Sequence, residues 1–423
     1  MGRIILVIAI LAILALAGVF NREQAIEWSA QERAQMRNLI LPDPETLKAQ
    51  VKRPGNAYWQ NEAAIALGEA LFFDPRLSGN GKVACATCHQ PDKAFTDGKV
   101  LSEGIAVAKR HAPSLIGIAT SPWFFWDGRA DSLWAQALGP LEDSAEQGSN
   151  RMQLARLIGR FYSAEYVQIF GSLPDFSDEQ RYPQQAMPVE NIQRADMQRL
   201  DDQWQAMRAE DQRRVNIVFA NIGKSLAAYQ SQLLPMASRF DLFAKAVLAG
   251  ETSELLTREE QKGLKLFLDD SKSQCMRCHN GPLFTSHDFA ITGIRDIPEP
   301  VGLGRLEGIQ KILKSPFNCM GTYSDTPDQC AELRYTKRQG EELRFAFKVP
   351  TLRNIAQTAP YMHTGSFQNL AGVLHYYNRA KSRYPDATSG KARHLDVAPL
   401  RLASRQLQQI EAFLKTLSSL PGK

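Results

Sequence analysis

The strongest constraint on this chain is a pentapeptide pattern that occurs twice. Residues 85–89 read CATCH and residues 275–279 read CMRCH, so two C-x-x-C-H motifs lie 190 residues apart. This pattern is the attachment sequence for c-type haem, in which two thiols bond to the haem vinyl groups and the His ligates iron. We therefore expect a fold built around two covalently bound haems. Their expected attachment and proximal residues are Cys85, Cys88, His89, Cys275, Cys278 and His279.

The sequence preceding each motif is also repeated. Residues 67–74 (LGEALFFD) precede the first motif and residues 263–269 (GLKLFLD) precede the second. Both segments read as a helix that ends shortly before the attachment site, and Pro75 stops the first one. The two halves of the chain therefore share the order helix, then motif.

A second repeat follows each motif. Residues 113–128 and 350–365 begin Pro-Ser/Thr-Leu and have equal length, which places Trp126 and His363 at equivalent positions. Repetition of this kind indicates duplication of one structural unit. We therefore predict a mainly α protein with two tandem cytochrome c-like haem domains.

The remaining pattern is mostly helical and sets the predicted domain limits. Residues 216–233 form one expected helix, and the apolar positions between 407 and 417 recur at spacings of three and four, as in an amphipathic helix. Strand-like alternation is scarce. We predict an N-terminal haem domain over residues 21–215 and a C-terminal haem domain over residues 216–423.

The first twenty residues resemble a targeting segment. Arg3 precedes an uninterrupted apolar run over residues 4–14, and residues 15–17 (ALA) fit a signal-peptide cleavage site. Counted through Phe20, the run reaches the lower limit for a membrane span, so a retained anchor is the alternative. In both cases the rest of the chain crosses the membrane. We expect a periplasmic protein, either free or anchored to the inner membrane.

Cysteine usage and charge agree with export. The two cysteines outside the motifs, Cys319 and Cys330, lie eleven residues apart, and we predict a disulfide between them, with two free thiols as the alternative. The net charge is +5, with basic residues scattered among acidic ones. That distribution gives no basic patch for nucleic acid.

Several motifs together resemble the bacterial di-haem cytochrome c peroxidase and MauG family. Besides the two C-x-x-C-H motifs they are FWDGRA at 125–130, PTLRN at 350–354 and APYMH at 359–363. The resemblance runs from about residue 55 to the C-terminus. It implies that the N-terminal haem reacts with hydrogen peroxide and that the C-terminal haem relays electrons, with Trp126 between them. It also implies distal roles for Gln136 and Glu146, where a carboxylate would move a proton between the peroxide oxygens.

Two departures from the family pattern concern the sixth iron ligands. Peroxidases of the family that need reductive activation carry a distal His near the position of Glu103, and this chain has none there. The first haem is therefore expected to be open. Where peroxidases have an axial Met for the second haem, this chain has Tyr377, as MauG-type members do. The alternatives are that Tyr377 is an ordinary helix residue, or that Met362 is the ligand.

Family members also bind calcium between their domains, and here that site is doubtful. The position of the family's Asn ligand is His111, and imidazole is a poor ligand for a hard cation. The matching backbone carbonyls would be those of Thr358 and Pro360.

The leading functional hypothesis is an exported di-haem peroxidase that draws electrons from a small cytochrome c or a copper protein. A MauG-like enzyme that oxidises residues of a partner protein is the second hypothesis. A non-enzymatic di-haem electron carrier is the third. A zinc protein is the remaining alternative, although paired zinc half-sites usually lie only tens of residues apart.

Overall fold

The computed structural model describes residues 26–51, 54–190, 192, 194–294, 302–381, 383–385 and 392–420. Helices dominate this part of the chain, and its four strands are two or three residues long, as predicted. None of its helices combines the length and the apolar character needed to cross a bilayer. The predicted signal or anchor segment, residues 1–20, lies outside the described residues.

The first motif is carried by a helical cluster centred on α10 (Ala209–Gln230). α10 packs against α4 (Glu62–Phe73), α6 (Leu133–Glu142) and α7 (Arg151–Phe161). Gly68 allows α4 to approach α10 closely, because a Cβ atom there would lie 1.9 Å from the carbonyl oxygen of Ser225.

The second motif is carried by a similar cluster. α12 (Arg258–Leu268) packs against α16 (Ser404–Lys415), and α15 (Leu370–Asn378) packs on α16. Gly263 allows α12 to approach α16 closely, as Gly68 does for α4 and α10, because a Cβ atom there would lie 1.9 Å from the carbonyl oxygen of Gln409. Both halves therefore use a glycine in the helix before the haem motif to bring a second helix into contact.

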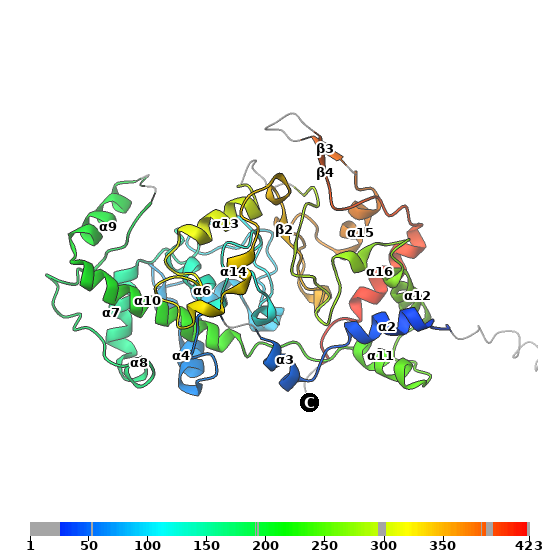
Figure 1. Cartoon of the computed structure of the whole chain (residues 1–423), viewed down its shortest axis with the longest axis horizontal. Coiled ribbons are helices and arrows are strands. Elements are labelled where there is room, and N and C mark those ends of the chain that lie inside the picture. The colour runs from blue at the N-terminus through cyan, green and yellow to red at the C-terminus, as the bar shows by residue number, and fades with distance from the viewer. Residues whose placement is uncertain are drawn as a thin grey trace, which may run out of the picture.

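The remaining helices and strands connect or flank these clusters. The other α-helices are α2 (Ala30–Leu39), α3 (Pro44–Gln50), α5 (Cys85–Cys88), α8 (Ser163–Phe170), α9 (Ala195–Ala206), α11 (Arg239–Ala249), α13 (Arg305–Lys314) and α14 (Ala331–Tyr335). Two antiparallel pairs form, β1 (Phe289–Ala290) with β2 (Phe347–Lys348) and β3 (Arg383–Pro385) with β4 (Ala392–His394). In the elongated molecule, α7, α8 and α9 lie at one end and α2, α11, α12 and α16 at the other (Figure 1).

Each half contains a segment from the other end of the chain. α2 packs on α11 and α12 of the second cluster. Residues of the second half return to the first cluster, where Phe317 packs on Phe219 with ring centroids 5.4 Å apart. The predicted limit between residues 215 and 216 falls inside α10, which packs along its length with the first cluster. We propose that the limit between the two haem units lies after Gln230 instead.

The predicted disulfide is confirmed. Cys319 and Cys330 are bonded, with their Cα atoms 5.7 Å apart, and both are buried. The backbone N–H of Cys319 donates to Asp131 Oδ2 at 2.9 Å. The bridge therefore fixes a second-half loop onto a side chain of the first half.

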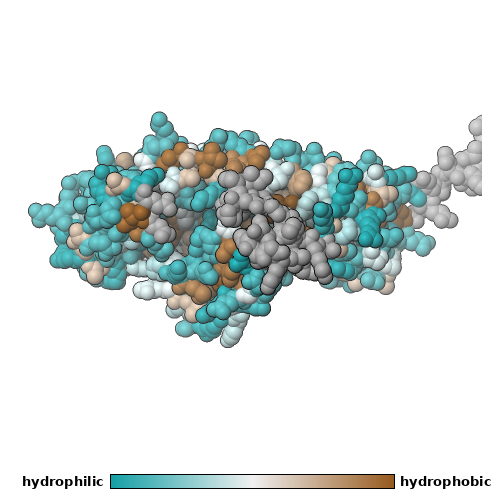
Figure 2. All heavy atoms as spheres, turned by 90° about the horizontal axis from the view of Figure 1, so that it is seen from above, coloured by the Kyte–Doolittle hydropathy of each residue, from teal (hydrophilic) through white to brown (hydrophobic). Residues whose placement is uncertain are grey.

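The molecular surface is largely polar on the face shown in Figure 2, where hydrophobic residues form separate groups among hydrophilic ones. Exposed apolar residues include Val107 at 57% and Val100 at 46%, both in the loop after the first motif.

Candidate haem sites and the junction between them

Both motif histidines are oriented in the same way. His89 Nδ1 lies 3.0 Å from the carbonyl oxygen of Phe95, and His279 Nδ1 lies 2.9 Å from that of Phe284. Each of these Phe residues has left-handed backbone geometry, with φ of 58° and 53°, which turns its carbonyl back toward the ring. A carbonyl accepts only from a protonated nitrogen, so Nδ1 carries the proton and Nε2 is left for iron.

The protonation state of the two imidazoles also suits iron binding. Burial lowers the pKa of His89 and of His279 below the usual value, which favours the neutral ring at physiological pH. Neutral imidazole is the form that ligates metals. The four motif cysteines are free thiols, as covalent attachment requires.

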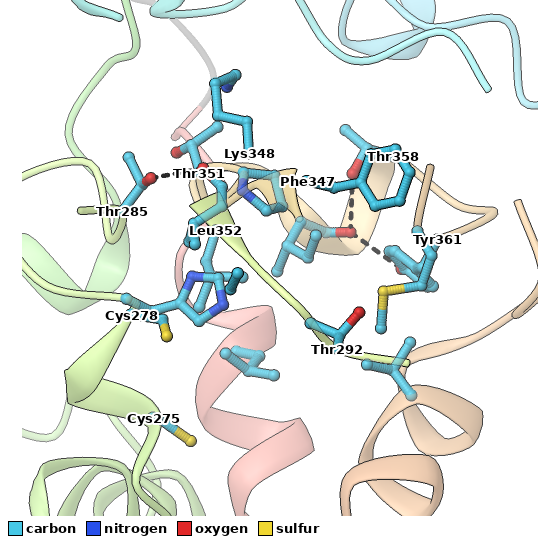
Figure 3. Close-up of a pocket in the computed structure, with 18 of the residues that line it drawn as sticks. Cys275, Cys278, Thr285, Thr292, Phe347, Lys348, Thr351, Leu352, Thr358 and Tyr361 are labelled. Carbon is cyan, nitrogen blue, oxygen red and sulfur yellow. Dashed lines mark hydrogen bonds between the residues drawn. The ribbon is translucent and has the colours of Figure 1, made fainter. Parts of the chain in front are cut away.

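The second motif opens into a cavity whose shape and lining suit a haem. Cys275, Cys278 and His279 line it together with side chains of α15 and α16 (Figure 3). The wall is mostly apolar and includes Leu374, Ile410 and Leu414. Two thiols, an oriented imidazole and an apolar wall are the features that a covalent haem needs.

Tyr377 lines the same cavity. Burial raises the pKa of its hydroxyl well above the usual value, and the charges of Tyr376, Cys278 and Cys275 add to that rise. Among the described residues its hydroxyl has no hydrogen-bond partner, whereas the neighbouring Tyr376 hydroxyl donates to the carbonyl oxygen of Thr292 at 2.6 Å. A buried phenol of this kind ionises readily only beside a cation such as a bound metal. Met362 also lines the cavity, so both predicted candidates for the sixth position face it.

Glu146 is close enough to the first motif to influence its thiols. Burial, followed by the charges of Asp97 and Glu146, raises the pKa of Cys88 to about 12. Burial raises the pKa of Glu146 itself to about 7, and the neighbouring Asp143 adds to the rise while Arg129 opposes it. Glu146 is therefore a carboxyl that exchanges its proton near neutral pH.

The other predicted distal residue, Gln136, lies on α6, the helix that precedes Glu146. Its Oε1 atom is buried and has no hydrogen-bond partner among the described residues. This amide oxygen can accept a hydrogen bond from a water molecule or a ligand bound beside it.

The loop after the first motif is fastened to the segment that carries Glu146. The backbone N–H of Ile105 donates to the carbonyl oxygen of Glu146 at 2.9 Å, and that of Ala106 donates to Ala145 at 2.9 Å. Glu103, at the position where related enzymes have a His, is exposed and forms an ion pair with Lys99. The Glu103 side chain is therefore paired with Lys99 at the protein surface.

Trp126 lies at the junction of the two halves and lines the second cavity. Its indole Nε1–H donates to the carbonyl oxygen of His111 at 2.8 Å, and its own carbonyl oxygen accepts from the N–H of Lys348 at 2.8 Å. The N–H of His111 in turn donates to the carbonyl oxygen of His363 at 3.0 Å. A run of hydrogen bonds, two between backbone groups and one from the Trp126 indole, therefore joins the two halves.

This network includes His111, one of the residues considered for calcium. His111 is buried, its Nδ1 lies 2.8 Å from the carbonyl oxygen of Lys99, and its backbone is engaged as described. Its imidazole is thus used within the protein, and calcium stays doubtful.

Sequence reasoning missed two residues beside the motifs. The Nε2 of Gln147 donates to Cys85 Sγ at 3.4 Å, and Lys348 lines the second cavity. Lys348 could have been found by aligning the two repeats, because it directly precedes the Val-Pro-Thr-Leu segment, as His111 precedes Ala-Pro-Ser-Leu. Gln147 had no comparable signal, since it is one position from the predicted Glu146.

Comparison with known proteins gives a consistent set of relatives. A family model described as di-haem cytochrome c peroxidase matches residues 62–248. The methylamine utilization protein MauG of Methylorubrum extorquens is 27% identical over 90% of this chain and 86% of its own length. Cytochrome c551 peroxidase of Pseudomonas aeruginosa is 28% identical over 85% of this chain and 79% of its own.

Solved structures share the fold. The di-haem peroxidase BthA of Burkholderia thailandensis superposes with a TM-score of 0.58 at 23% identity, covering 85% of this chain and 86% of that chain. A MauG-like protein associated with microbial copper homeostasis gives a TM-score of 0.57 at 24% identity, covering 93% and 96%.

Proposed function

Because this chain belongs to the bacterial di-haem cytochrome c peroxidase and MauG family, we propose that it reduces hydrogen peroxide at the His89 site with electrons relayed through the His279 site. It is a peroxidase-type oxidoreductase. The observation that carries the proposal is Glu146, a half-buried carboxyl with a pKa of about 7 beside the first motif.

Glu146 supports this proposal because cleavage of the O–O bond needs a proton moved from one peroxide oxygen to the other. A carboxyl whose pKa lies near the working pH can both accept and donate that proton. Gln136, on the preceding helix, can orient peroxide through its amide group. Haem iron, when bound at His89 and His279, supplies the redox chemistry.

Trp126 supports electron relay between the sites. Its ring lines the second cavity, and its backbone and indole N–H join both halves. Family members place a Trp between their haems, and we propose the same role for Trp126. The electrons would come from a small cytochrome c or a copper protein in the periplasm.

A second candidate function is MauG-like oxidation of residues on a partner protein. Two observations favour it. The position expected for a distal His holds Glu103, which is exposed and paired with Lys99, and Tyr377 lines the second cavity. A third reading, a simple electron carrier, is disfavoured by the raised pKa of Glu146 and by the Gln136 amide oxygen that has no hydrogen-bond partner among the described residues.

One experiment separates these readings. Purified holoprotein with two haems is mixed with reduced small cytochrome c and hydrogen peroxide, and oxidation of the cytochrome is followed optically. Rapid peroxide-dependent oxidation that is lost in Glu146→Gln supports the peroxidase. Without such oxidation, but with peroxide-dependent loss of Trp or Tyr in an added protein, the MauG-like function is supported. A protein that exchanges electrons with the cytochrome but does not consume peroxide is a carrier.

A further inference from the structure

Lys348 is a cation that lines the second cavity. The carboxylate of Asp396 lines the same cavity, but it accepts from the backbone N–H of Ile291 at 2.7 Å and forms no ion pair with Lys348. Lys348 belongs to β2, whose Phe347–Lys348 pairs with β1, and its side chain lines the cavity with Cys275 and Cys278. Among the described residues its ammonium group has neither an ion pair nor a hydrogen bond, and burial alone lowers its pKa, to about 8.

Lys348 is half-buried, and three cations that are more deeply buried do have partners. Arg353 pairs with Asp241, Lys224 pairs with Asp325, and Arg305 donates to the carbonyl oxygen of Gly128 at 2.6 Å. An isolated buried charge is costly unless it is paired and hydrogen-bonded. The partner of Lys348 should therefore be an anion that occupies the cavity.

The position of Lys348 within the cavity indicates which anion this is. Figure 3 shows Lys348 at the opposite end of the cavity from Cys275 and Cys278. Thioether attachment fixes the vinyl-bearing edge of a haem at the cysteines, and the two propionates extend from the other edge. The propionate edge therefore points toward the end of the cavity where Lys348 lies.

We propose that Lys348 is the ion-pair partner of a propionate of the second haem. This proposal rests on haem attachment at Cys275 and Cys278. The same residue donates its backbone N–H to the carbonyl oxygen of Trp126, so the anchored propionate would lie beside the junction of the two halves.

The pair has a measurable electrostatic consequence. A cation beside a propionate offsets its negative charge and favours the reduced, less positive iron. Removing the charge in Lys348→Met should lower the equilibrium constant for reduction of the second haem by roughly tenfold, or ~59 mV for a one-electron couple. Lys348→Arg should stay close to the unmodified protein, because it keeps the charge.

The test is a spectroelectrochemical titration of each haem in the holoprotein. Lys348→Gln is measured beside Lys348→Met. It also removes the charge, but its side chain can still form a hydrogen bond, so it serves as the neutral variant if Lys348→Met loses haem. Lys314→Met, at the exposed end of α13, controls for the change in total charge. Haem content is measured first. An unmodified protein that carries one haem would refute attachment of two haems, which is a different failure from loss of the Lys348 pair. With two haems present, a selective fall in the second midpoint supports the pair. An unchanged midpoint in both neutral variants, or an equal fall in Lys314→Met, overturns it.

Discussion

At the scale of single residues, the environment of Glu146 determines a pH dependence. Its carboxyl is protonated below about pH 7 and ionised above it, because burial and Asp143 raise its pKa. If Glu146 is the base that takes the peroxide proton, peroxidase kcat/KM rises with pH through about 7. Glu146→Gln should remove that limb and lower kcat/KM by about 10²–10⁴-fold, the range typical of acid–base catalysis. Steady-state kinetics between pH 5 and 9 measure both effects.

Asp143 and Glu165 provide matched variants for this test. Asp143→Asn removes a charge that raises the Glu146 pKa, so the acid limb should move to lower pH. Glu165→Gln, on the exposed side of α8, should leave the limb in place. If the rise of kcat/KM with pH persists in Glu146→Gln, a group other than Glu146 causes it.

Tyr377 gives a second prediction at this scale, with its neighbour as the control. If Tyr377 is the sixth ligand of the second haem, Tyr377→Phe should change the absorption and EPR spectra of that haem alone. Tyr376→Phe should not, because the Tyr376 hydroxyl donates to the carbonyl oxygen of Thr292. Unchanged spectra in Tyr377→Phe would leave Met362 as the candidate.

At the scale of helices, the close packing of α12 on α16 predicts a large effect from a single methyl group. In Gly263→Ala the new Cβ atom would meet the carbonyl oxygen of Gln409, and a backbone atom cannot move aside as a side chain can. We expect a loss of roughly 1–3 kcal/mol in the free energy of unfolding. Urea denaturation measures it. Gly372→Ala is the control, since its Cβ atom would meet only side-chain atoms, of Phe367 at 3.3 Å and of Asn369 at 3.5 Å. An equal loss in both variants would contradict the packing argument.

The helices show how far the sequence could be interpreted. The expected helix over 216–233 overlaps α10, Ala209–Gln230, which begins and ends earlier than predicted. The amphipathic pattern at 407–417 corresponds to α16, Ser404–Lys415. Periodicity located α16 because that helix has one apolar face, whereas α10 is buried on all sides from Val218 to Gln230. It could not show that the start of α10 packs with the first cluster, because that depends on contacts distant in sequence. For the same reason the pairing of Lys348 with Trp126 was not predictable from local pattern.

At the scale of the whole molecule, segments from each half of the chain contact the other half and hold the two together. Arg353, buried in the second half, pairs with Asp241 and also donates to the carbonyl oxygen of Leu39 at 2.9 Å. In the opposite direction, Asn216 on α10 donates to the Tyr323 hydroxyl at 3.0 Å. We expect that opening either tie would loosen the junction at Trp126, so that the relative placement of the two motifs depends on contacts far from both.

The disulfide offers a direct test of this dependence. Removing it in Cys319→Ala/Cys330→Ala should lower stability by about 2–3 kcal/mol, as expected for a short closed loop. The loop packs on the first cluster, so the loss should appear in the unfolding of the first half, followed through the His89 haem. Both haems should still attach, because neither motif uses these cysteines. In the unmodified protein, thiol titration after unfolding without a reductant should find neither Cys319 nor Cys330 as a free thiol. If stability were lost only around the His279 haem, the loop would not be tying the halves together as its contacts with Asp131 and Phe219 indicate.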